Sequence, residues 1–131
     1  MAFKPQQSDI QSTLSIEYYP TTASETYVAG ELLKLSSGAL TKSGATDAPL
    51  FIAEASYVAP SSGQQPLAVT RIQKTMKYET TNTAALTSVP IGSKVTIHTD
   101  GLQVTATTTS GVAEIVSKSD DAAGSKVVVR F

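Results

Sequence analysis

The sequence predicts an all-β fold, either a small β-barrel or a β-sandwich-like domain of about eight short antiparallel strands, preceded by an extended N-terminal arm. Three observations support this prediction. Short runs of alternating apolar and polar residues recur along the chain, with glycine-marked turns between them. Threonine is abundant, and its branched side chain favours strands. No segment combines the 3.6-residue apolar period of a helix with a convincing N-terminal cap.

The clearest predicted element is an antiparallel hairpin over residues 92–106, with its turn at Asp100-Gly101. This dipeptide is favoured in two-residue turns, because such turns need φ > 0 at both central positions. The register then places Ile97 opposite Val104, and the apolar residues of both strands fall on one face. We therefore expect a hairpin with one buried face and one polar face.

Further strands are expected before and after this hairpin. Alternation, apolar runs and flanking turn residues place them at residues 28–35, 39–42, 49–55, 67–72, 75–79, 112–117 and 126–131. Ser36-Ser37-Gly38 is the expected turn between the first two. Because the last strand should join the sheet, we expect removal of residues 129–131 to impair folding or solubility.

Residues 1–27 differ in composition from residues 28–131, which we expect to form the β-rich domain. Residues 1–15 are largely polar, and residues 16–19 have the pattern of one short strand. We expect residues 1–27 to form an extended arm that packs on another surface. A frayed terminus is the alternative interpretation.

The charge balance argues against several classes of partner. The ten basic and eleven acidic residues are scattered, so no basic field is present to attract nucleic acid or anionic lipid. No stretch approaches the ~20 apolar residues of a membrane span, and no signal peptide is recognisable. The chain has no Cys, which excludes a disulfide framework. We expect synthesis in the cytoplasm, no nucleic-acid or membrane partner, and modest stability that association increases.

The residues that could carry chemistry are few and scattered. The single histidine, His98, is expected on the polar face of the hairpin among Thr and Gln side chains, which is weak support for a catalytic base. Asp120-Asp121 lacks the spaced oxygen ligands of a calcium loop and is expected in a turn. Nothing singles out a catalytic pair among the acidic residues of the predicted strands, Glu31, Glu54, Glu79 and Glu114. We expect no catalytic residue, no metal site and no cofactor, and a protein that is not an enzyme.

Four stretches of the chain, taken in order, carry a likeness to a known family. They are residues 30–42 (GELLKLSSGALTK), a proline followed by residues 51–55 (FIAEA), residues 91–95 (IGSKV) with Gly101-Leu102, and residues 111–116 (GVAEIV) before a terminal strand. In this order they resemble the small capsid decoration (cement, or head-stabilising) proteins of tailed bacteriophages, over roughly residues 28–131. The resemblance implies a β-rich structural protein of the virion. Such a protein binds the outer surface of the assembled head, often as a homotrimer, and clamps neighbouring subunits of the major capsid protein.

The N-terminal arm matches no motif of that family, and we expect it to become ordered on the capsid by adding a strand to a sheet edge. Its candidate contact residues are Phe3, Lys4, Ile10, Leu14, Tyr18 and Tyr19. Two alternatives stay open. One is a carbohydrate- or ligand-binding β module of a phage fibre or adhesin, which would use exposed tyrosines. The other is a tail-tube or baseplate subunit.

Overall fold

The computed structural model describes residues 2–8 and 15–131, and over these residues the chain forms short β-strands and no helix. The strands are β1 (Lys4–Ser8), β2 (Ile16–Tyr19), β3 (Thr26–Tyr27), β4 (Leu32–Ser36), β5 (Ala39–Lys42), β6 (Phe51–Ala53), β7 (Tyr57–Val58), β8 (Leu67–Arg71), β9 (Met76–Thr81), β10 (Lys94–Val95), β11 (Ala113–Lys118) and β12 (Lys126–Arg130). The predicted all-β class is confirmed. The described part of the chain has twelve strands where about eight were expected, and three of the twelve have only two residues.

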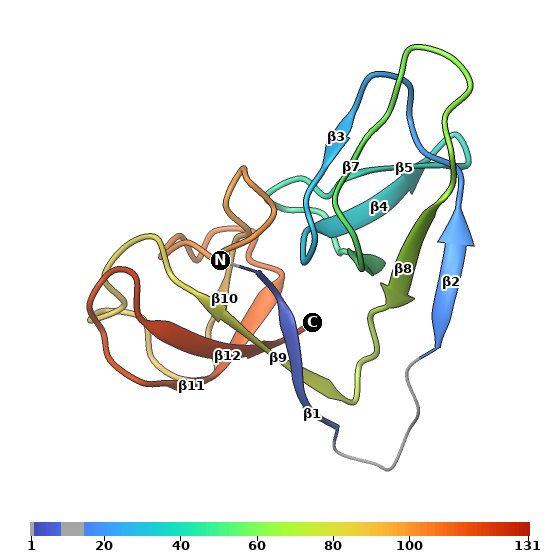
Figure 1. Ribbon diagram of the computed structural model, residues 1–131. Helices are drawn as coiled ribbons and strands as arrows, with labels where there is room; N and C mark the ends of the chain where they lie inside the picture. Colours follow the sequence, from blue (N-terminus) through green and yellow to red (C-terminus); the bar gives the residue numbers. More distant parts are fainter. Residues whose placement is uncertain (1, 9–14) are drawn as a thin grey trace.

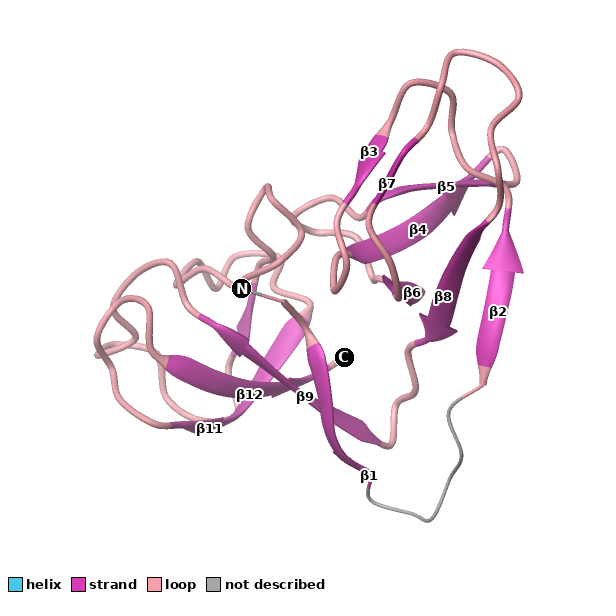
Figure 2. Ribbon diagram, viewed as in Figure 1, coloured by secondary structure: helices cyan, strands magenta, loops and turns pink. Residues whose placement is uncertain are grey.

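The strands form two five-stranded antiparallel sheets and one two-stranded ribbon (Figure 1, Figure 2). Sheet A has the order β1-β9-β12-β11-β10, sheet B has the order β2-β8-β6-β4-β5, and β3 pairs with β7. Every strand of sheet B comes from the chain between β1 and β9, so sheet B is an insertion within sheet A. Each sheet keeps two edge strands among the described residues, so the fold is not a closed barrel.

The predicted hairpin is confirmed at one residue pair but not in its turn, and its only named strand, β10, pairs with β11. Ile97 pairs with Val104, as expected. The Gly101 N–H donates to the His98 carbonyl at 2.9 Å, so the turn is wider than Asp100-Gly101. Gly101 has φ at 72°, whereas Asp100 does not have the positive φ that a two-residue turn requires.

Alternation along the strands separates buried from exposed faces. In β9 the side chains of Met76, Tyr78 and Thr80 are buried and those between them are half-buried, as the sequence predicts for Met76 and Tyr78. The core of sheet B is a separate cluster of buried side chains: Tyr27, Leu33, Leu40, Phe51, Ala53, Ala59, Leu67 and Val69.

The two sheets meet at a junction that we call the seam. Leu32 and Ile52 belong to strands of sheet B, yet their side chains are buried in the core of sheet A. Main-chain hydrogen bonds cross the same junction. The Leu32 N–H donates to the Gly101 carbonyl at 2.9 Å, and the Phe3 N–H donates to the Gly30 carbonyl at 3.1 Å. Shared core residues and shared main-chain bonds therefore join the two sheets.

The described parts of residues 1–27 are extended, and both of their longer strands are paired. β1 lies beside β9 at one edge of sheet A, and β2 lies beside β8 at one edge of sheet B. The expectation of a separate arm is therefore not confirmed, and the boundary at residue 27 stays a prediction.

The strand expected over residues 126–131 is confirmed as β12. It lies between β9 and β11 and is therefore an interior strand of sheet A. The Phe131 ring follows it and lies 5.7 Å from the rings of both Phe3 and Tyr78. Residues near both ends of the chain therefore complete one aromatic cluster.

Candidate interaction surface

The two five-stranded sheets have four edges, and three of them carry features that hinder pairing with another strand. β1 carries Lys4 and Pro5, and its register with β9 shifts after Pro5. β10 is two residues long and contains Lys94. β5 is covered by the preceding chain, since the Leu40 N–H donates to the Pro20 carbonyl at 2.8 Å. These three edges are protected.

β2 is the fourth edge, and within residues 2–8 and 15–131 none of these features is found there. It contains no Lys or Pro, and it pairs only with β8 among the described strands. Its side chains alternate: Ile16 and Tyr18 are 58% and 68% exposed on one face, whereas Glu17 and Tyr19 are half-buried on the other. We call Ile16, Tyr18 and the unpaired side of β2 the open edge. A strand from another chain can pair with such an edge.

The inner face of β2 is held against sheet B by hydrogen bonds and ring contacts. Arg71 donates to the Glu17 carboxylate through Nε and Nη2, each at 3.2 Å, and the Tyr19 hydroxyl donates to it at 2.9 Å. The Arg71 guanidinium lies 4.8 Å from the centre of the Phe51 ring, and the Tyr19 ring lies 4.7 Å from it. The hydrogen bonds from Arg71 and Tyr19 lower the pKa of Glu17. The open edge is thus positioned before a partner binds, which reduces the entropy lost on binding.

The predicted contact residues that the structure describes differ in their sheet and in their exposure. Tyr18 and Tyr19 both lie on β2, but only Tyr18 belongs to the open edge. Lys4 is exposed on β1, in the other sheet. Phe3 is 2% exposed, so a contact through its ring would require the N-terminal segment to leave the core. The remaining two, Ile10 and Leu14, lie outside the described residues.

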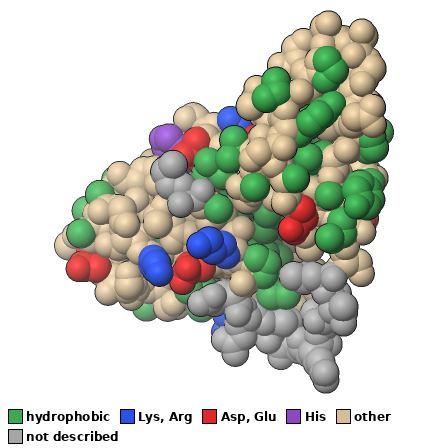
Figure 3. All heavy atoms as spheres, in the orientation of Figure 1, with side chains coloured by type: hydrophobic (Ala, Val, Ile, Leu, Met, Phe, Trp, Pro, Cys, Tyr) green, Lys and Arg blue, Asp and Glu red, His purple; other side chains and the backbone are tan. Residues whose placement is uncertain are grey.

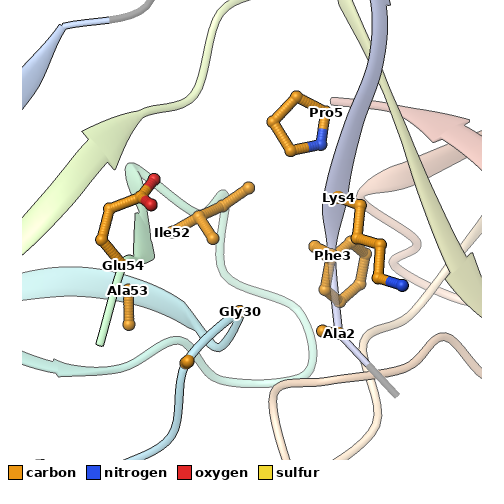
Figure 4. A pocket seen from close by; sticks show the side chains of 9 residues that line it. Ala2, Phe3, Lys4, Pro5, Gly30, Ile52, Ala53 and Glu54 are labelled. Carbon is orange, nitrogen blue, oxygen red and sulfur yellow. The ribbon is translucent and has the colours of Figure 1, made fainter. Parts of the chain in front are cut away.

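A hollow of about 250 Å³ lies at the seam (Figure 4). Residues 2–5 line one side, and Ile52 and Glu54 line the other. The Glu54 carboxylate accepts a hydrogen bond from the Thr70 hydroxyl. Lys4 is the only other charged side chain among the described residues of this lining.

The single histidine has an acidic neighbour that the predicted register did not indicate. His98 Nδ1 lies 3.2 Å from Asp100 Oδ1. Burial acts to raise the pKa of Asp100, but hydrogen bonds from the Gln103 amide, the Leu102 N–H and His98 lower it overall. His98 also lies opposite Gln103, as expected, and its main-chain N–H donates to the Gln103 carbonyl at 2.9 Å. Within residues 2–8 and 15–131, no hydrogen bond joins His98 to a hydroxyl group that could serve as a nucleophile.

Asp120 and Asp121 lie in a turn, as expected. Asp120 Oδ1 accepts the N–H groups of Asp121 and Ala122, and Asp121 lies 2.7 Å from Lys118 Nζ. In the part of the chain that the structure covers, no group of three or more His, Asp or Glu side chains is placed to hold a metal ion. These two carboxylates are therefore occupied by turn and ion-pair contacts.

Exposed apolar side chains are concentrated on the part of the molecule that contains sheet B. Six of the seven large apolar side chains that the described residues expose come from residues 16–58, and the seventh is Ile91. Figure 3 shows much of the hydrophobic surface of this face over that part of the molecule. Val58, which is 70% exposed on β7, was not predicted, since a two-residue strand shows no alternation.

The open edge likewise depends on which strands become neighbours, which a single sequence does not reveal. The one local signal was the composition of residues 16–19, which have strand character and lack Lys and Pro. The structure has no helix, over the residues it describes, that is long and apolar enough to cross a membrane. Comparison of the chain with protein-family models, with curated proteins and with solved structures gives no match.

Proposed function

We propose that this chain is a capsid decoration protein of a tailed bacteriophage. It binds the outer surface of the assembled head as a homotrimer and clamps neighbouring subunits of the major capsid protein. The observation that carries the proposal is the open edge, the one unprotected edge of the two large sheets in the described chain. The resemblance of residues 28–131 to decoration proteins supports the same function.

The open edge offers two kinds of contact to a capsid segment. Unpaired main-chain groups of β2 can form a further ladder of hydrogen bonds with an extended strand. Ile16 and Tyr18 add apolar area, and burial of such area contributes roughly 25 cal/mol per Å². Arg71 already holds Glu17 of β2 by two hydrogen bonds. The strand therefore needs little further ordering when a partner binds.

The seam supports the clamping part of the proposal. Sheet B, which carries the open edge, is joined to sheet A through Leu32, Ile52 and main-chain hydrogen bonds. Two sheets joined in this way can contact two capsid subunits and hold them at a fixed distance. A protein that binds only the assembled shell stabilises that shell by mass action.

Lysine at the open edge should weaken binding to the capsid. We expect the double variant Ile16→Lys, Tyr18→Lys to bind expanded phage heads at least about 10-fold more weakly than the wild type, because it places two charges at the contact. Co-sedimentation of the labelled protein with expanded heads measures this difference. The melting temperature of the double variant should stay close to the wild-type value, since both replaced side chains are exposed.

The matched control is Val58→Lys, which introduces one charge at a side chain that is 70% exposed on β7, outside the open edge. It should bind heads as the wild type does. Equal binding by the control and the double variant would exclude the open edge as the contact. Failure of the wild type to sediment with expanded heads would exclude the function itself.

One observation favours the saccharide-binding alternative. Tyr18 lines an open hollow of about 490 Å³ together with Pro20, Thr21, Gln64 and Pro66. An exposed aromatic ring beside an amide is suited to a neutral, hydroxyl-rich ligand. Binding on a glycan array that Tyr18→Ala abolishes would support this alternative.

Light scattering of the purified protein tests its assembly state. A trimer supports the decoration function, whereas a ring supports a tail-tube subunit.

A further inference from the structure

The turn that precedes Leu102 packs directly onto the start of β4 and the end of β5. The Gly101 carbonyl accepts the Leu32 N–H, and the Ile97 N–H donates to the Ala45 carbonyl at 3.0 Å. A Cβ atom at Gly101 would lie 3.0 Å from Glu31 Cγ and 3.3 Å from Lys42 Cγ. The main chain of the turn therefore covers the stem of Glu31 at the seam.

Glu31 is a buried carboxyl group whose hydrogen bonding is incomplete. Its side chain is 1% exposed. Oε2 accepts the Val28 N–H at 3.0 Å, but Oε1 is buried without a hydrogen-bond partner. Its nearest cation is Lys42, with Nζ at 3.8 Å and a side chain that is 42% exposed. A carboxylate buried in this way is costly unless it is paired, whereas a neutral carboxyl group costs much less.

The charges that face Glu31 come from three other elements and act on its ionised form in opposite directions. Lys42 on β5 attracts the negative charge, whereas Glu25 before β3 and Asp100 in the turn repel it. His98, in the same turn, lies 3.2 Å from Asp100. Burial, the largest cause, raises the pKa of Glu31, and the Val28 N–H and Lys42 only partly oppose it.

We propose that Glu31 is an acid-responsive latch of the seam: the protonated carboxyl group keeps the turn docked on β4 and β5, and ionisation loosens that contact. The stabilising contribution of the latch is complete below the ordinary glutamate pKa of 4.5 and is lost as pH rises through the raised value. Ionisation draws water towards the buried Oε1, and water reaches this atom only if the turn that covers Glu31 moves. This property of Glu31 does not depend on capsid binding.

Hydrogen exchange at single amides tests the latch. The Leu32 and Ile97 N–H groups, bonded to Gly101 and Ala45, report on the seam. The Leu50 N–H, bonded to the Leu33 carbonyl at 2.9 Å, reports on sheet B alone. Between pH 4.5 and pH 8 we expect protection factors at Leu32 and Ile97 to fall about 10-fold or more, because ionisation of Glu31 loosens the contact between the turn and β4. The protection factor at Leu50 should stay constant.

Two variants assign the effect to Glu31. Glu31→Gln cannot ionise, so protection at Leu32 and Ile97 should stay high at every pH. Lys42→Gln removes the cation that favours ionised Glu31. The pH midpoint at which protection of Leu32 and Ile97 is lost should therefore be higher in this variant. Protection that is independent of pH in the wild type would overturn the latch, and so would a wild-type pH profile in Glu31→Gln. An unshifted or lower midpoint in Lys42→Gln would also overturn it.

Discussion

Removal of residues 129–131 should leave a chain that is largely unfolded at 25 °C. Val129 is fully buried and pairs with Ile115 on one side and Tyr78 on the other. The deletion also removes the Phe131 ring from its contacts with Phe3 and Tyr78. Lost apolar burial and lost ladder hydrogen bonds together cost about 5 kcal/mol, which is comparable with the ~5–15 kcal/mol that holds a typical domain folded. Circular dichroism and urea denaturation measure the result.

Phe131→Leu is the matched control for this truncation. It keeps the β12 ladder and most of the apolar volume, so it should lose only about 1 kcal/mol of unfolding free energy. A truncated chain with a wild-type urea midpoint would show that the end of β12 contributes little to sheet A. A loss as large in Phe131→Leu as in the truncation would assign the effect to the aromatic cluster and not to the ladder.

Gly111→Ala should be the most damaging of the single alanine substitutions at glycine. A Cβ atom there would lie 2.3 Å from the Lys94 carbonyl oxygen and 2.6 Å from the Val95 nitrogen. Both are main-chain atoms of β10, so the strand itself must move, and the hydrogen bond from the Val112 N–H to the Val95 carbonyl is lost with it. We expect a loss of about 3 kcal/mol, measured as a melting temperature lower by about 10 °C.

Gly38→Ala separates steric overlap from the intrinsic cost of losing a glycine. Gly38 lies in the β4–β5 turn with φ at 81°, and a Cβ atom there would contact nothing within 4 Å. Its expected cost is about 1 kcal/mol, which is the conformational penalty alone. Equal losses in the two variants would contradict the steric explanation for Gly111.

The fold was predictable where local pattern decides the structure. The alternation in residues 75–79 predicts the buried face of β9, and Ser37 and Gly38, both at positive φ, form the expected turn between β4 and β5. The Asp100-Gly101 turn was wrong because glycine is also favoured at the fourth position of a wider turn, where Gly101 lies. Residue composition alone does not separate these two turns.

The candidate surface was only partly predictable, because it depends on contacts between distant segments. The sequence places Tyr18 in the predicted N-terminal arm, and the structure does expose it. Phe3 belongs to the same predicted arm, yet its ring is buried against Phe131. The local sequence does not distinguish Glu31 from the other acidic residues of the predicted strands. Its burial depends on a turn around Gly101, 70 positions later in the chain. Solvent exposure of a single residue is a property of the packed chain and not of its local pattern.

The insertion of sheet B within sheet A has a consequence for the order of folding during synthesis. All strands of sheet B are complete once residue 71 has left the ribosome, whereas β1 and β9 are joined to β11 only through β12, which follows all the other described strands in the sequence. Sheet B can therefore form first, while β1 waits for partners that lie far along the chain. During that interval Leu32 and Ile52 have no core to cover them. The nascent chain is consequently most prone to aggregate before β12 has been made.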